Sequence, residues 1–351
     1  MKRAEPQASE GGLAAAPCPA HLFDERGRPK LGVFRGTPVT AAVERWASWL
    51  GRLFRQKRWQ YTAVAGKDLV AAAAVAHLGY VGLAFVLVWD RRNRRWFESE
   101  ALTPLALGIR ADGPPGESRF TYRGEQGELT MRSSGGERMV QAQFKGNFPS
   151  GVEVVQFDWV LPGSAFEPLT CVSELSGGGI NVTHKAAGLP VGGVVRLGTE
   201  VVTLERGTHV AMLDWSRGFP PRRTAWNWAM AAGRAIGGTP LGLNLCVGYN
   251  DAVETENVVW LDGQLHRLGP VRFSIPEGES AAPWTITSAA GDVDLTFEPE
   301  TGRSADENFI LVQSRYRQRI GTFTGRILGP RGVPIDLDGL PGVTEDHRAL
   351  W

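Results

Sequence analysis

The sequence is poor in three features that often reveal what a protein does: lysine, cysteine and an excess of charge of one sign. Its 351 residues carry 38 Lys and Arg against 37 Asp and Glu, so the formal net charge is only +1. Proteins that coat nucleic acid carry a clear basic excess. A nucleic-acid partner is therefore not expected, and an apolar small molecule is the first partner to consider.

The cysteines are too few and too scattered to build a site. Cys18, Cys171 and Cys246 form neither a paired disulfide framework nor a C-x-x-C zinc motif. The odd number fits a reducing compartment, and residues 1–17 read as a disordered leader without a signal-peptide core. We expect a cytoplasmic protein. The metalloprotease and phosphate-loop motifs are also missing, so no metal and no cofactor are expected.

One long uncharged run, residues 69–89, needs an explicit test because it could span a bilayer. His77 and Gly79 interrupt it, and its first part is only weakly apolar alanine. Two buried strands joined by a turn at 77–80 explain the run equally well. We expect no transmembrane span.

Glycine and tryptophan, by contrast, are abundant, with 44 and 12 residues. After Trp59 the chain consists of roughly twenty short extended runs separated by Gly, Pro, Asn and Asp, which is typical of all-β proteins. That number exceeds what one small barrel holds, so we expect two β-barrels in tandem, with glycine at their bends. The linker-like stretch 186–193 divides them into residues 18–186 and 187–351.

The only helical signal lies near the N-terminus. Within residues 41–55, Val43, Trp46 and Leu50 recur at three- and four-residue spacing, and Thr40 is placed to cap the first turn. We expect one short amphipathic helix there.

The segment 181–185, N-V-T-H-K, contains a histidine and a lysine side by side. His184 is one of six histidines, and Lys185 is one of only six lysines. Lysine is a compact charge whose pKa can fall on burial, which arginine does not offer. These residues are either a functional pair or a solvated turn lysine beside a structural histidine.

The segment 214–229 combines an acid with paired tryptophans. On a strand, Trp226 and Trp228 share one face, with Arg222 in phase. They would line an amphipathic pocket while Asp214 pairs with a nearby arginine. The alternative is a tryptophan core layer with a structural Asp–Arg pair.

Two further segments could contribute. In 241–251, leucines alternate with a small polar face that carries Asn244 and Cys246, of which the cysteine reads as inert filler. At 344–351, Glu345, Asp346 and His347 stand together, and a carboxylate–imidazole couple among them could act as general acid and base. The alternative for this end is a tail pinned by Trp351 with solvated charges.

Taken together, these motifs resemble a bacterial family catalogued only as a domain of unknown function. The resemblance spans residues 18–351 but shows no signature at 112–136. The matching motifs are P-x-H-L-F-D-x-R-G-R-P at 19–29, T-H-K-x-A-G-L-P at 183–190, D-W-x-R-G-x-x-P-R-R-T-x-W-N-W-A at 214–229, G-L-N-L-x-x-G-x-N-D at 242–251 and E-D-H-x-A-x-W at 345–351.

More distantly, the W-x-W strand that follows an Asp-bearing strand is similar to carotenoid hydratase and AttH-type proteins. Those proteins are double-barrel, calycin-like folds. The likeness implies two calycin- or lipocalin-like barrels here, in agreement with the number of expected strands.

Three functions stay open. The first is binding of an apolar, lipid- or isoprenoid-like molecule inside a barrel, with Trp226 and Trp228 as its wall and Arg222 or Lys185 for an anionic head group. Asn244 would line the same site.

The second is a hydratase or isomerase acting on such a molecule, with Asp214 or Asp346 as the acid and His184 or His347 as its partner. The third is a structural or interaction protein without a cavity. The sequence predicts no oligomeric state.

Overall fold

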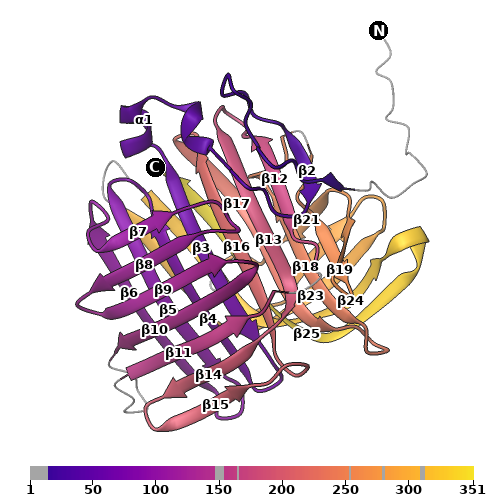
Figure 1. The fold of residues 1–351 in the computed structure, drawn as a ribbon. Coiled ribbons are helices and arrows are strands. Elements are labelled where there is room, and N and C mark those ends of the chain that lie inside the picture. Colours follow the sequence, from indigo (N-terminus) through magenta and orange to yellow (C-terminus); the bar gives the residue numbers. More distant parts are fainter. Residues whose placement is uncertain (1–14, 147–153, 164–165, 253, 279–280, 309–312) are drawn as a thin grey trace.

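The computed structural model describes residues 15–146, 154–163, 166–252, 254–278, 281–308 and 313–351, and nearly all of its secondary structure is β-strand (Figure 1). The strands form three sheets of nine, seven and nine strands. The helical elements among the described residues are short: η1 Val43–Trp46, α1 Trp49–Phe54 and η2 Pro330–Gly332. The all-β class with one short N-terminal helix is confirmed.

The first sheet, sheet 1, is the middle layer of the molecule. Its nine strands follow the order β1-β2-β12-β13-β16-β3-β4-β5-β6. Their bounds are β1 Ala16–Pro17, β2 Gly32–Arg35, β3 Lys57–Ala65, β4 Leu69–His77, β5 Val81–Asp90, β6 Arg95–Pro104, β12 Leu169–Glu174, β13 Ile180–Pro190 and β16 Val210–Phe219. β4 and β5 account for the long uncharged run, because both of their faces are buried. The prediction of two strands and a turn is confirmed.

Sheet 2 covers one face of sheet 1 and lies in front of it in Figure 1. Its order is β15-β14-β11-β10-β9-β8-β7. The bounds are β7 Ile109–Asp112, β8 Arg119–Gly124, β9 Gly127–Ser134, β10 Glu137–Lys145, β11 Val154–Leu161, β14 Gly192–Leu197 and β15 Glu200–Leu204. Phe120, Val140 and Trp159 of this sheet pack against Val64 and Val86 of sheet 1, and these side chains fill the space between the two sheets.

Sheet 3 curls around a core of its own. Its order is β20-β19-β18-β17-β25-β24-β23-β22-β21, and β21 comes back into contact with β18. The bounds are β17 Arg223–Arg234, β18 Pro240–Val247, β19 Val258–Leu261, β20 Gln264–Arg267, β21 Val271–Ser274, β22 Trp284–Ser288, β23 Val293–Asn308, β24 Gln313–Leu328 and β25 Pro334–Leu350. Trp284, Phe297 and Phe323 fill the curled interior.

A third apolar layer joins the second face of sheet 1 to the convex side of sheet 3, with Met212 and Met230 at its centre. The backbones of β13 and β18 approach closely at this junction. A Cβ atom on Gly242 would lie 1.9 Å from the carbonyl oxygen of Ala187, so only glycine fits there. The two halves therefore meet through a continuous core.

The sequence predicts one continuous helix over 41–55, but the structure divides this segment into two helical elements. Residues Val43–Trp46 form a 3-10 turn (η1) and Trp49–Phe54 form the short helix α1. Ser48 caps α1 by accepting a hydrogen bond from the Gly51 amide at 3.3 Å, which starts a new helix where the old one would continue. Thr40 does not cap it, since its hydroxyl lies 3.0 Å from the His21 ring.

The chain changes sheet later than the expected boundary. β14, β15 and β16 follow residue 187 but belong to sheets 1 and 2, and sheet 3 begins at Arg223. We propose that a structural division lies at 220–222, and the boundary at 187 stays an untested prediction. In the described part of the chain, no helix has the length and apolar character needed to cross a membrane.

Candidate functional site

A cavity of about 530 Å³ opens between sheets 1 and 3. It lies outside both curled halves, whose interiors are occupied by their own buried side chains. Several aromatic rings line it, among them Trp59, Tyr61, Phe85, Trp226, Trp228 and Tyr249. This cavity is therefore not the barrel interior that the sequence reasoning expected, and a ligand inside a barrel stays a prediction.

Strand alternation decides which polar residues reach the cavity. In β13, successive side chains point to opposite faces, so Lys185 points towards sheet 3 and His184 towards sheet 2. Asp214 of β16 lies directly opposite Lys185 in the antiparallel register, and the two share a face. The adjacent residues His184 and Lys185 of the T-H-K motif therefore point into different layers of the molecule.

Lys185 sits in a buried charge cluster at one end of the cavity. Its Nζ donates to Glu256 Oε1 at 2.7 Å and lies 3.4 Å from Asp214 Oδ2. Asn250 Nδ2 donates to the other oxygen of Glu256 at 2.8 Å. The three charged side chains are only 5%, 11% and 1% exposed for Lys185, Asp214 and Glu256. We call these residues the lysine cluster.

One cation and two carboxylates share this dry site, which affects where protons reside. Burial raises the pKa of Asp214, and the nearby Glu256 charge adds to that, although Lys185 opposes it. Burial alone would lower the pKa of Lys185, but the Asp214 and Glu256 charges outweigh it and raise the pKa. Lys185 is thus held as a cation between two carboxyl groups, and the proton affinity of Asp214 is raised.

A second polar group, formed by Glu345 and His347, lies on the opposite wall of the cavity. Glu345 Oε1 accepts hydrogen bonds from Trp226 Nε1 at 2.9 Å and from His347 Nδ1 at 3.3 Å. The other His347 nitrogen is 3.1 Å from Ser314 Oγ. Burial would raise the pKa of Glu345, but the hydrogen bonds and charge of His347 and the Trp226 bond lower it. An ionised carboxylate therefore orients the imidazole.

Arg303 ties the two sheets together along this wall. Its Nη1 donates to Glu98 Oε1 at 3.1 Å and to Glu100 Oε2 at 3.0 Å, both on β6. Its guanidinium carbon also lies 3.7 Å from the centre of the Phe85 ring. This contact links sheet 3 to sheet 1 at the cavity wall.

Most of the residues predicted from the sequence meet here. Five of them line the cavity: Lys185, Asp214, Trp226, Trp228 and His347. Asn244 lies behind the wall, where it accepts from Trp228 Nε1 at 2.9 Å and donates to the Glu256 carbonyl at 2.9 Å. Arg222 is exposed and donates to the Trp351 carbonyl at 2.9 Å, outside the cavity lining.

Two predicted residues lie elsewhere. His184 is buried towards sheet 2, with Thr170 Oγ1 at 3.0 Å and Arg138 Nη2 at 3.3 Å. Burial and the Arg138 charge lower the pKa of His184, so the ring stays neutral. Asp346 points to the other face of sheet 3 and bonds Arg317 at 3.0 Å. The structure does not bring either residue to the cavity.

The sequence reasoning assigned no role to Glu256 or Arg303, named Glu345 only beside Asp346 and His347, and chose the wrong partner for Asp214. Lys185, not an arginine, contacts Asp214, while Arg217 donates to backbone carbonyls. Glu256 was findable in principle, since a buried lysine requires a buried carboxylate. Arg303 lies in a polar strand and carries no sequence signal.

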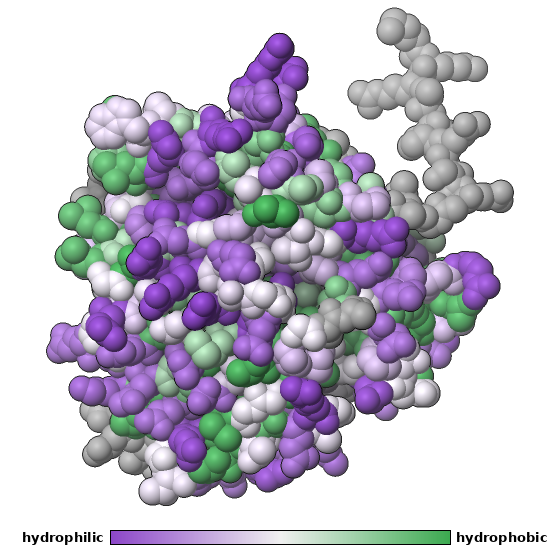
Figure 2. Space-filling view, viewed as in Figure 1, coloured by the Kyte–Doolittle hydropathy of each residue, from purple (hydrophilic) through white to green (hydrophobic). Residues whose placement is uncertain are grey.

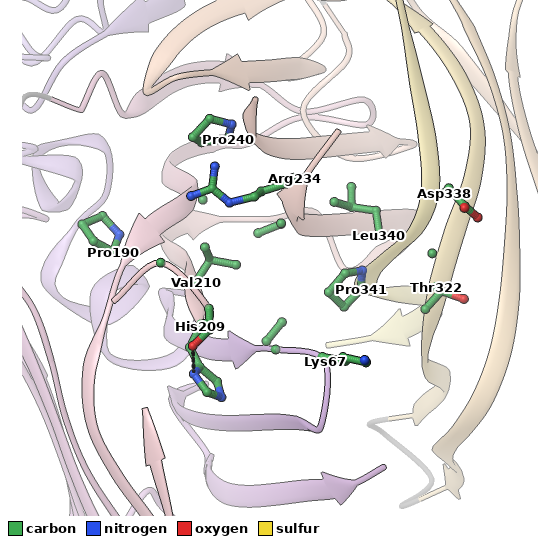
Figure 3. Close-up of a pocket in the computed structure, with 18 of the residues that line it drawn as sticks. Lys67, Pro190, His209, Val210, Arg234, Pro240, Thr322, Asp338, Leu340 and Pro341 are labelled. Carbon is green, nitrogen blue, oxygen red and sulfur yellow. Dashed lines mark hydrogen bonds between the residues drawn. The ribbon is translucent and has the colours of Figure 1, made fainter. Parts of the chain in front are cut away.

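A larger cavity of about 690 Å³ lies at the other end of the interface between sheets 1 and 3 (Figure 3). Figure 3 shows its charged residues Lys67, Arg234 and Asp338 on separate elements, with their charged ends apart. His209 is held by the backbone amide of Glu205 at 3.1 Å. Among the described residues no cluster of three or more metal-ligating side chains occurs. The lining of this second cavity also includes Arg91 and Glu300, which form an ion pair at 2.8 Å and are 13% and 30% exposed, so their charges are less buried than those around Lys185.

Comparison with known proteins gives a family but no activity. The model of the family described as "Domain of unknown function (DUF2804)" matches residues 15–351. No curated protein matches the sequence. Among solved structures, kievitone hydratase from Nectria haematococca is 10% identical, with 86% of this chain and 92% of that chain covered and a TM-score of 0.48. A putative AttH from Nitrosomonas europaea is 12% identical, with 88% and 96% covered and a TM-score of 0.42.

Proposed function

Because the chain belongs to the DUF2804 family, whose description states no activity, we propose its function from the cavity: binding of a largely apolar small molecule that carries one polar group. The observation that carries the proposal is an aromatic-walled cavity of about 530 Å³ in which a few buried polar groups converge. Sites for small molecules usually have this size and composition.

The charges narrow the chemistry of the ligand. Lys185 is already compensated by Glu256 at 2.7 Å, and Asp214 lies at 3.4 Å. An anionic head group would face two carboxylates, so a hydroxyl or carbonyl group suits this end better than a carboxylate or phosphate. Tyr61 and Trp228, in an edge-to-face contact at 5.7 Å, suit a lipid- or isoprenoid-like body.

Fluorophore titration tests the binding proposal. The neutral dye N-phenyl-1-naphthylamine should bind with enhanced emission, and Leu83→Trp should weaken it about tenfold by filling the cavity. Val210→Trp is the matched control, because it places the same ring in the second cavity. Equal loss in both variants, or no dye binding at all, would reject the proposal. Native mass spectrometry of protein from its source would then identify the ligand.

A second candidate function is proton transfer as in a hydratase or isomerase, because burial raises the pKa of Asp214 and so favours a carboxyl group that holds a proton. Asp214 would donate it to an alkene carbon, and the electron pair of the double bond would form the new C–H bond. Water would add to the resulting cation and lose its proton to His347, which Glu345 orients. Trp226 and Trp228 would stabilise the cation through their ring faces.

Deuterium exchange tests this candidate. With geraniol as an isoprenoid probe in D₂O, mass spectrometry should detect deuterium on carbon or an added water. Asp214→Asn should abolish this and leave dye binding intact. Asp346→Asn is the control, since that carboxylate bonds Arg317 on the far face. Without exchange in the unaltered protein the enzyme candidate is rejected, whereas the binding proposal is judged by the dye alone.

The place of the proposed ligand differs from that in calycin- or lipocalin-like proteins. Such folds hold their ligand inside a barrel, whereas the proposed ligand lies between two curled halves. The calycin-like description of each half stays a prediction.

A further inference from the structure

Large apolar side chains are exposed mainly in two segments. Of the thirteen exposed large hydrophobic residues among those described, five lie in 46–54 and three in 102–107. Trp49 is 67% exposed, and Leu105 and Leu107 are 68% and 66% exposed. We call these eight residues the apolar patch: Trp46, Trp49, Leu50, Leu53, Phe54, Leu102, Leu105 and Leu107. A concentration of this kind marks an interaction site more often than scattered apolar residues do.

The two segments flank one turn, the β4–β5 turn at 78–80. A Cβ on Gly79 would lie 2.9 Å from the carbonyl oxygens of both Leu53 and Phe54, so α1 rests against this turn. On the other side, the Leu105 amide donates to the Tyr80 carbonyl at 2.8 Å. The two apolar segments are therefore neighbours, and Figure 2 shows hydrophobic residues gathered at the upper left, over α1 and β7 of Figure 1.

The apolar patch borders the mouth of the site. Leu78 and Tyr80 of the turn line the cavity, as does Leu102, which is itself 44% exposed. The cavity and the patch therefore share Leu102, where the cavity lining is exposed. An apolar ligand would enter or leave across an apolar surface without first crossing water.

Positive charge accompanies the apolar residues. Arg52 and Arg55 are exposed, and no side chain of the described residues pairs with either. Surface elements that lie on bilayers combine Trp, Leu and Phe with arginines in this manner, because the rings settle at the headgroup level and the arginines contact anionic lipid.

We propose that the apolar patch docks on an anionic lipid bilayer and turns the cavity mouth towards the membrane. A second copy of this chain fits less well, because two-fold contact through the patch would bring Arg52 and Arg55 close to the same residues of the copy. This inference concerns a macromolecular surface and stands apart from ligand binding in the cavity.

Vesicle co-sedimentation tests the proposal with the full chain. We expect binding to vesicles of phosphatidylcholine mixed with phosphatidylglycerol, and at least about tenfold weaker binding to pure phosphatidylcholine. Trp49→Ser/Leu53→Ser should weaken binding about tenfold or more, and Arg52→Gln/Arg55→Gln should remove the preference for anionic vesicles.

The matched control is Ile236→Ser/Val333→Ser, which removes two apolar residues that are 64% and 53% exposed elsewhere on the surface. Its binding should stay unchanged. Failure of the unaltered protein to bind anionic vesicles, or equal loss in the control, would overturn the proposal. A dimer in size-exclusion chromatography that Trp49→Ser/Leu53→Ser disrupts, without vesicle binding, would assign the patch to a second copy. Dye titration of the same variants separates these outcomes from failure of the cavity.

Discussion

The two cavities lie at opposite ends of the interface between sheets 1 and 3, with packed apolar side chains between them, yet only one of them resembles a functional site. The second is the larger, at about 690 Å³ against 530 Å³. Turns rich in glycine and proline surround it, and its lysine and aspartate are exposed. The first has aromatic walls and a buried charge cluster. Cavity volume therefore does not identify the functional site here, whereas the presence of buried charged side chains does.

The difference arises along shared strands. β17 supplies Trp226 and Trp228 to the first cavity and Gly233 and Arg234 to the second. Met230 lies between them in the common core. Because the backbone is continuous, the choice of side chains, and not the topology, makes one end a site. Variants that are matched across the two ends can therefore test the comparison directly.

The largest effect should come from Lys185→Met. It leaves Glu256 and Asp214 buried without their cation, so we expect the free energy of unfolding in urea to fall by about 3–5 kcal/mol. Lys67→Met in the second cavity should change it by less than about 0.5 kcal/mol, because that lysine is exposed. Adding Glu256→Gln to Lys185→Met should restore part of the loss. Equal costs for both lysines would remove the distinction between the cavities.

A pH scan gives the next largest effect, through Lys57 near the mouth of the first cavity. Burial lowers the pKa of Lys57 from 10.5 to about 7. Between these values the unfolded chain holds the proton and the folded chain does not, so stability should rise with pH by up to about 1.4 kcal/mol per pH unit. Lys57→Met should flatten this rise, measured as urea unfolding from pH 7 to 10. If Lys67→Met flattens it equally, the assignment to Lys57 fails.

The smallest effect should come from Trp226→Phe. It removes the hydrogen bond of 2.9 Å to the buried carboxylate of Glu345 while keeping most of the ring. Charge-assisted bonds of this type contribute about 1.5 kcal/mol or more, so a loss of that size is expected in urea unfolding. His209→Phe, at the second cavity, should cost less because its ring bonds an exposed backbone amide and the Thr208 hydroxyl, neither of which is charged. The reverse order would place the more important polar contacts at the second cavity.

Much of the site followed from local patterns in the sequence. The rarity of lysine singled out Lys185, and strand alternation placed Trp226 and Trp228 on one face. The same alternation separates His184 from Lys185 and Asp346 from His347, since neighbours on a strand face opposite ways. Applied consistently, it would have kept only one member of each pair.

What the sequence could not reveal depends on contacts between distant residues. Glu256 lies 71 positions from Lys185 along the chain, and β16 pairs with β3 as well as with β13. No local pattern encodes such register. The cavity lies between the halves because sheet 1 is covered on both faces. In the sequence, this double burial is visible only as the long apolar run of β4 and β5. The prediction of one continuous helix over 41–55 failed for a local reason, because Ser48 caps a separate helix, α1.

The position of β25 bears on the order in which the molecule can be assembled during synthesis. β25 follows β17 and β24 along the chain but inserts between them, and it carries Glu345 and His347. On a ribosome, sheets 1 and 2 can pair as soon as β16 has emerged, while sheet 3 must wait with two unpaired edges until β25 arrives. A nascent chain halted before β25 would therefore already hold the lysine of the site but lack its histidine, and it would expose strand edges that chaperones recognise.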